Sequence, residues 1–218
     1  MTAETINIIL AYSCTLPAVV GLLFYKRMDK CYHPFIWAMW LSVFSETTSR
    51  FILPFSTQPL LHICLIHVYY LLHFYFFLLL FYRLEVINKS LLKNILIFGC
   101  IIFFVNAMFK PVFFNLLGEK TIAFYLIIFY FAVKLLTLQI FNHNINIGTN
   151  ALFFIGCGLL MLAFPILQNI IRIIVRYFYN LSTAKITVLQ YVFVIANAVS
   201  YILFFIATIY IPKKLKKI

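Results

Sequence analysis

The chain has 218 residues, of which 65% are hydrophobic and only 10% are charged, and its mean hydropathy is +1.06. A water-soluble domain usually has about a quarter of its residues charged, so this composition argues against an ordinary globular domain in water. The net charge of +12 comes from short basic runs between apolar segments, a pattern that indicates membrane topology rather than nucleic-acid binding.

Seven apolar segments approach or exceed the length of about 20 residues that a helix needs to cross a bilayer. They cover residues 6–24, 34–53, 60–82, 94–110, 121–141, 150–170 and 186–211. The connections between them are short, and no segment reads as a separate soluble domain. We therefore predict an all-α fold: a polytopic transmembrane helical bundle of seven helices, forming one integral membrane domain over residues 1–218.

Basic residues are divided unevenly between the two sets of connections: ten in the set that includes the C-terminal tail and five in the other. The positive-inside rule then places the C-terminus in the cytoplasm and the N-terminus outside. We expect a multi-pass protein of the cytoplasmic (inner) membrane, bacterial in origin. The residues expected at the membrane interface, in contact with lipid head groups, are Lys26, Arg27, Lys30, Lys213 and Lys214.

Polar residues inside apolar helices are costly and usually face the interior of a bundle. Glu46 and Arg50 are four residues apart, so they can pair on one helix face; the pair is either structural or part of a functional site. At 1.5 Å per residue, His73, Lys134 and Asn197 fall at depths similar to that of Glu46. These five residues predict one polar, ligand-binding pocket, unless each group is satisfied locally on its own helix.

Several chemistries find no support in the sequence. His62 and His73 are about 16 Å apart along one helix, so they cannot share a metal ion, and no HExxH occurs. The five cysteines are scattered without a CxxC, which predicts neither a disulfide framework nor a zinc site. The last apolar segment has no lysine for a retinal Schiff base. We expect no cofactor and no catalytic residues, and an enzyme is the less favoured class.

Residues 17–53, "PAVVGLLFYKRMDKCYHPFIWAMWLSVFSETTSRFIL", resemble a group of small, uncharacterised bacterial seven-helix membrane proteins. These share a loop of the form Tyr-Lys-x-x-Asp-Lys-x-Tyr-x-Pro-Phe, followed by a carboxylate in the second helix. The pattern falls here on Tyr25, Lys26, Asp29, Lys30, Tyr32, Pro34, Phe35 and Glu46. The residue before the carboxylate is Ser45, where the group often has Asn. The resemblance implies the fold and gives weight to Glu46, but it implies no activity.

The function we predict is a receptor or sensor-like membrane module that binds a small or lipophilic ligand in its polar pocket. It would contact membrane lipids and signal to a cytoplasmic partner protein, with no role for nucleic acid. A small permease or transport subunit, with Glu46 and Lys134 lining the path, is the alternative. A lipid-acting membrane enzyme that uses Glu46 and His73 as acid and base is the third hypothesis.

Overall fold

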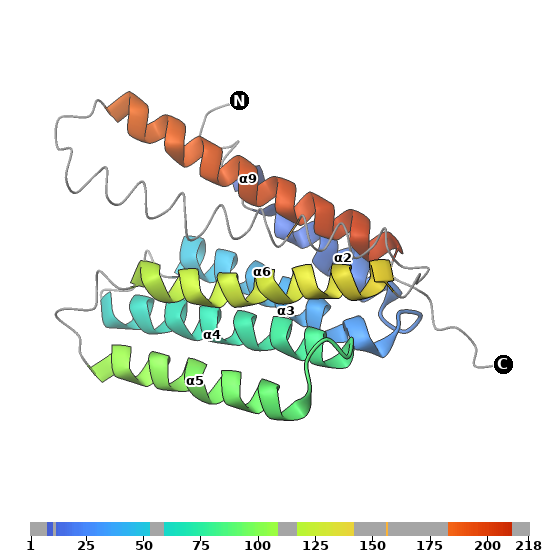
Figure 1. Ribbon diagram of the computed structural model, residues 1–218. Coiled ribbons are helices and arrows are strands. Elements are labelled where there is room, and N and C mark those ends of the chain that lie inside the picture. The colour runs from blue at the N-terminus through green and yellow to red at the C-terminus, as the bar shows by residue number, and fades with distance from the viewer. Residues whose placement is uncertain are drawn as a thin grey trace.

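The computed structural model of the protein describes residues 8–10, 12–52, 59–108, 117–141, 156 and 183–210. Within these ranges the chain is almost entirely helical (Figure 1). Two 3-10 helices, η1 (Tyr12–Cys14) and η2 (Lys30–Tyr32), precede α2 and α3, and a π-helix, η3 (Thr48–Ile52), continues α3. The α-helices are α2 (Thr15–Phe24), α3 (His33–Thr47), α4 (Pro59–Arg83), α5 (Lys89–Met108), α6 (Leu117–Phe141) and α9 (Thr183–Tyr210).

The helices contradict the predicted membrane bundle. Over the residues that the structure describes, none of them contains an apolar stretch long enough to cross a membrane. The first two predicted spans are shortened by local structure, because η1 precedes an α2 of 10 residues and η3 ends an α3 of 15 residues. Both helices fall short of the roughly 20 residues that a span requires. For these two segments the prediction was wrong because mean hydropathy does not reveal where helices begin and end.

The predictions that require membrane-spanning helices are therefore also wrong. The seven-span fold class, the outward N-terminus, the cytoplasmic C-terminus and the inner-membrane localisation are all overturned. Lys26, Arg27 and Lys30 are exposed around the α2–α3 connection, but their assignment to lipid head groups has lost its basis. Lys213, Lys214 and, apart from Gly156, the predicted span 150–170 lie outside the described residues.

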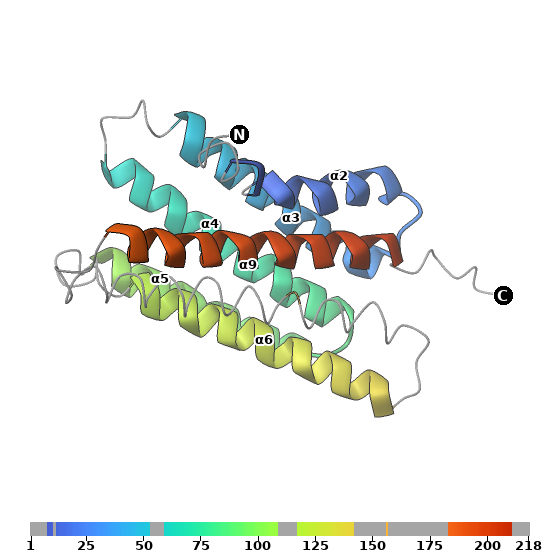
Figure 2. The same cartoon turned by 90° about the horizontal axis from the view of Figure 1, so that it is seen from above.

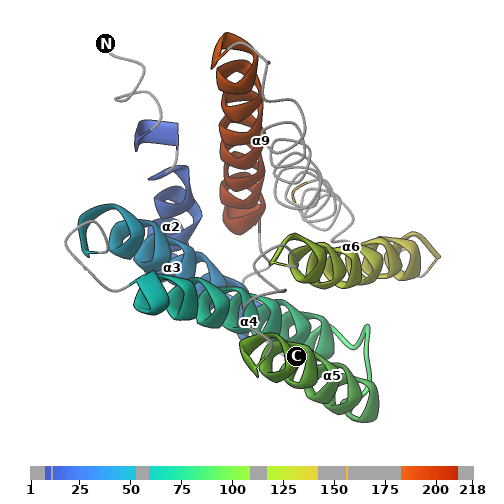
Figure 3. The ribbon, with the colours of Figure 1, turned by 90° about the vertical axis from the view of Figure 1, so that its left-hand side faces the viewer.

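Helix α4 lies at the centre of the described part and packs against α3, α5 and α6 (Figure 3). Helix α2 packs against both α3 and α9 (Figure 2). Helices α4 and α6 run parallel, since the rings of Phe74 and Phe124 stack with centroids 4.3 Å apart. Phe81 and Phe131, seven residues further along each helix, again meet at 5.9 Å. The level of a residue along α4 therefore identifies the residues of α6 that lie at the same level.

An aromatic cluster joins α3, α4 and α9. The ring of Phe204 lies 5.2 Å from that of Phe35 and 6.2 Å from that of Phe77, and all three side chains are fully buried. Burying a large apolar side chain contributes roughly 1.5–3 kcal/mol, so this cluster is a main source of stability. Gly21 permits the close approach of α2 to α3, because a Cβ atom there would lie 2.2 Å from Cδ1 of the buried Ile36.

The end of the bundle at the α2–α3 connection is held by a set of satisfied polar contacts, and we call it the capped end. Asp29 accepts a hydrogen bond from the Cys31 backbone N–H at 2.9 Å and so caps η2. Trp37 Nε1 donates to the Tyr25 hydroxyl at 3.1 Å. Arg83 lies over the Trp37 ring at 5.7 Å and donates to the backbone carbonyl of Lys30 at 2.8 Å. These contacts tie the connection to the end of α4.

Candidate functional site

The opposite end of α3 is built differently, and we call it the pocket end. There the backbone leaves the α-helical pattern at Thr48 and continues as the π-helix η3. The wider turn of a π-helix is rare and is frequently found at functional sites. Thr48 is 7% exposed, and its hydroxyl is buried with no hydrogen-bond partner in the described part of the chain. An unpaired buried hydroxyl costs free energy, so this end of the helix is locally destabilised.

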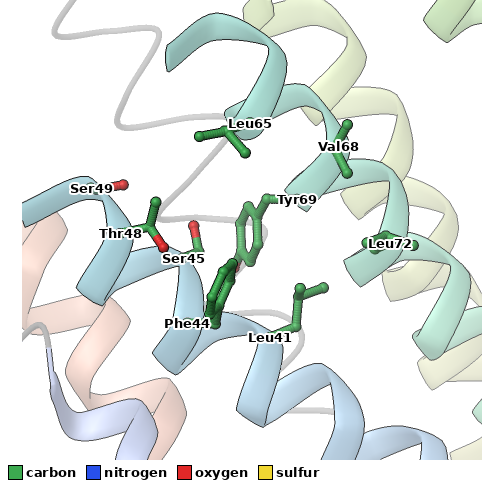
Figure 4. A pocket seen from close by; sticks show the side chains of 9 residues that line it. All are labelled: Leu41, Phe44, Ser45, Thr48, Ser49, Leu65, Val68, Tyr69 and Leu72. Carbon is green, nitrogen blue, oxygen red and sulfur yellow. The ribbon is translucent and has the colours of Figure 1, made fainter. Parts of the chain in front are cut away.

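A pocket of about 90 Å³ lies between this segment and α4. Side chains of α3 and η3 form one wall and side chains of α4 the other (Figure 4). Among the described residues, the lining is apolar except for hydroxyl groups and contains no charged side chain. The pocket reaches the surface, because several lining residues are more than a third exposed. Its lining residues are Leu41, Phe44, Ser45, Thr48, Ser49, Leu65, Val68, Tyr69 and Leu72.

Behind the pocket, Tyr69 leads into a buried hydroxyl network. Ser42 Oγ donates to the backbone carbonyl of Ala38 at 3.1 Å and lies 3.3 Å from the Tyr69 hydroxyl. The hydroxyl of Tyr201, from α9, forms hydrogen bonds with both Ser42 and Tyr69. Burial raises the pKa of both phenols well above the ordinary value for tyrosine, so they remain neutral donors. The network couples α3, α4 and α9 directly to one wall of the pocket.

His73 lies one turn beyond Tyr69 on α4 and is 2% exposed. Its ring contacts those of Tyr69, Phe77 and Tyr125, with centroids 5.4, 5.0 and 6.2 Å away. Nε2 is buried and has no hydrogen-bond partner among the described residues. Burial lowers the pKa of His73 to about 4, so the imidazole is neutral near pH 7. It is therefore poorly suited to the acid–base role considered from the sequence.

Glu46 and Arg50 form an ion pair in which Arg50 Nε donates to Glu46 Oε1 across the α3–η3 junction. The pairing expected from their spacing is thus present, and each side chain is about one third exposed. Exposed pairs of this kind contribute at most about 1 kcal/mol. Neither residue lines the pocket. Their charges offset each other because the two side chains are paired.

The other predicted pocket residues are divided between two places. Asn197 lies on α9 one turn before Tyr201, and its Oδ1 is buried with no hydrogen-bond partner in the described part of the chain. Lys134 is partly buried on α6, nine residues beyond Tyr125, which contacts His73. That separation is about 13 Å along the helix, so Lys134 lies toward the capped end. None of the five residues predicted from the sequence lines the pocket.

Cys14, in η1, lies within electrostatic range of Glu46, Tyr69 and Tyr201. Burial, followed by the charge of Glu46, raises its pKa to about 12, so the thiol is not a nucleophile near neutral pH. Among the described residues, no group of three metal-ligating side chains occurs. No disulfide involves Cys14, Cys31 or Cys100, the cysteines whose side chains the structure describes.

The hydroxyl residues of the pocket end were not among the site residues predicted from the sequence. Ser42, Ser45 and Ser49 follow one another at helical spacing, so they occupy one side of α3 and η3. That spacing was a usable signal. It is weak because serine and threonine inside helices often bond to the carbonyl four residues earlier, as Thr47 does with Val43 at 2.8 Å.

Comparisons with protein-family models, with curated proteins and with solved structures gave no match. The function has to be inferred from the geometry of the described residues.

Proposed function

We propose that the protein is a ligand-responsive helical module, which binds a small neutral molecule between α3 and α4 and signals through a change in η3. The observation that carries this proposal is the buried Thr48 hydroxyl, which has no hydrogen-bond partner among the described residues and lies in a π-helix that borders a pocket. A segment with an unsatisfied polar group and irregular backbone favours a ligand that relieves both.

The lining fixes the class of ligand. Apolar side chains such as Leu41, Val68 and Leu72 favour a hydrocarbon body, whereas the hydroxyls of Ser45 and Thr48 favour one polar group that donates and accepts hydrogen bonds. No described lining residue offers a counter-charge, and burying an unpaired charge is unfavourable. A short aliphatic alcohol, or the hydroxyl-bearing end of a longer apolar molecule, fits these requirements.

The position of η3 suggests how ligand binding could be transmitted to a partner protein. A ligand hydroxyl that engages Ser45 or Thr48 would change the hydrogen bonding of the turn in which Thr48 begins the π-helix. Such a change would move Arg50 and the 60%-exposed side chain of Phe51, which a partner protein could recognise. The permease and the lipid-acting enzyme both presuppose a membrane-embedded chain, so neither is carried forward.

The test is ligand-observed NMR with 1-butanol, butyrate and butylammonium. We expect saturation transfer to 1-butanol and none above background to the two ions. Val68→Phe narrows the pocket and should abolish the transfer. Val19→Phe is the matched control, because Val19 is similarly exposed (46% against 43%) but lies on α2. Equal transfer to all three probes, or equal loss in both variants, would reject the proposal.

A further inference from the structure

A second cavity of a different kind lies along α5. It is an open groove of about 500 Å³, and every described residue that lines it belongs to α5. Lys89 and Lys93, both exposed, line one end of it. The remainder is apolar and is lined by Leu92, Leu96, Ile97, Cys100 and Ile101.

The groove follows the outer side of the bundle. Helix α5 packs against α4 and lies away from α2 and α9 (Figure 3). Ile97 and Ile101 are 48% and 54% exposed, so an apolar face remains open beside the two lysines. Lys89 and Lys93 place charge at one end of this face, and the other described lining residues carry none.

We propose that this groove binds a single-chain anionic amphiphile of the fatty-acid class. The carboxylate would lie between the ammonium groups of Lys89 and Lys93, which are one turn apart on the same face. The acyl chain would follow the apolar lining toward Ile101. From Lys89 to Ile101 the helix extends about 18 Å, which suits a long acyl chain. A cationic or uncharged amphiphile would leave the two lysines without a counter-charge.

This site is independent of the pocket between α3 and α4, because the two share no described lining residue. Glu85, which precedes α5, is the acidic side chain nearest in sequence, and it is exposed. It is therefore free to remain in water rather than neutralise the lysines in the groove.

Cys100 provides a direct probe because its thiol lies in the groove and is exposed. We would alkylate the purified protein with N-ethylmaleimide and follow the Cys100 peptide by mass spectrometry, with and without laurate below its micellar concentration. Laurate at about ten times its dissociation constant should slow the reaction about tenfold, as mass action requires. Cys31 is the internal control: it lies in η2, outside the groove lining, and burial raises its pKa to about 11, so its slow reaction should not change.

Two sets of controls make the result decisive. Replacing both Lys89 and Lys93 by glutamine should weaken laurate binding about tenfold or more, the usual effect of losing a charge-assisted contact. The same replacements at Lys26 and Lys30, at the α2–α3 connection, should leave protection intact. Equal protection by dodecanol or dodecyltrimethylammonium would overturn the proposal, as would its absence. Protection that rises with protein concentration alone would mean that a second copy of the chain covers the groove.

Discussion

The two ends of α3 differ in how their polar groups are satisfied. At the capped end, Asp29, Trp37 and Arg83 each have a hydrogen-bond partner. At the pocket end, the hydroxyls of Ser13 and Thr48 are buried without one in the described part of the chain. Native proteins pair most buried polar groups. A buried polar group without a partner therefore marks a place where the folded state is less stable than it would be with the group paired. The comparison indicates that the capped end supports the fold and that the pocket end is available for ligand binding.

The largest expected effect comes from the same substitution made near each end. Phe35→Ala removes a fully buried ring from the aromatic cluster and should lower the free energy of unfolding by about 3–5 kcal/mol. Phe44→Ala, at a position that is 63% exposed, should change it by less than about 1 kcal/mol. Chemical denaturation of the two variants measures both values. Similar losses would show that the two ends are equally packed.

The next effect is a dependence of stability on pH through His73, which lies behind the pocket. Its pKa is about 4 in the folded protein, against an ordinary value of 6.5. Between these values the unfolded chain binds a proton that the folded chain does not, so stability falls as the pH drops from about 6.5 to 4. The expected loss is about 3 kcal/mol.

The difference between the wild type and His73→Phe isolates this contribution from the carboxylates, which also titrate in acid. Denaturation at pH 7 and pH 4 should show a smaller acid loss in the variant. His33→Gln, at a partly buried histidine of the capped end, should keep most of the acid loss. If His73→Phe is as acid-sensitive as the wild type, the imidazole is not buried as described.

A smaller effect, with opposite signs at two sites, comes from paired Thr→Val substitutions. Thr48→Val removes a hydroxyl that has no partner in the described part of the chain and keeps the shape of the side chain, so it should raise stability by about 1 kcal/mol. Thr208 is also buried, but its hydroxyl donates to the Phe204 carbonyl at 2.7 Å. Thr208→Val should therefore lower stability by about 0.5–1 kcal/mol. Thermal unfolding of the two variants compares them directly, and a loss in both would mean that Thr48 has a partner.

The smallest effect is expected at Glu46, the residue that the sequence pattern emphasised most. Glu46→Gln breaks a pair whose members are about one third exposed, and it should cost less than about 1 kcal/mol. Because Glu46 does not line the pocket, binding of 1-butanol should be unchanged in the NMR assay. A loss of binding in a variant that remains folded would instead assign Glu46 to the ligand site.

The sequence was informative where a single helix decides the outcome. Six of the seven predicted ranges overlap an observed helix, although they are not membrane spans, and the i,i+4 pairing of Glu46 with Arg50 is present. The sequence was not informative where packing between helices determines which residues lie together. The level of Lys134 depends on how α6 is aligned with α4, and the rings of Phe74 and Phe124 set that register rather than any local pattern.

The pocket was missed for a related reason. Hydropathy treats tyrosine, serine and threonine as weakly polar, so it cannot reveal that Ser42, Tyr69 and Tyr201 meet from three helices. The residues of the resembling loop proved easier to explain: Asp29 caps η2, and Tyr32, Pro34 and Phe35 are buried. Such contacts account for that motif by the structure of the capped end, without a binding role.

The most direct measurement of the central claim is amide hydrogen exchange in η3, with and without saturating 1-butanol. If a ligand in the pocket engages the π-helix, the amides of Thr48, Ser49 and Arg50 should exchange more slowly when it is bound. Amides in the middle of α4, such as that of Leu78, should not change, and Val68→Phe should remove the effect. Exchange in η3 that is unaltered by bound butanol would contradict the claim that this segment reports ligand binding.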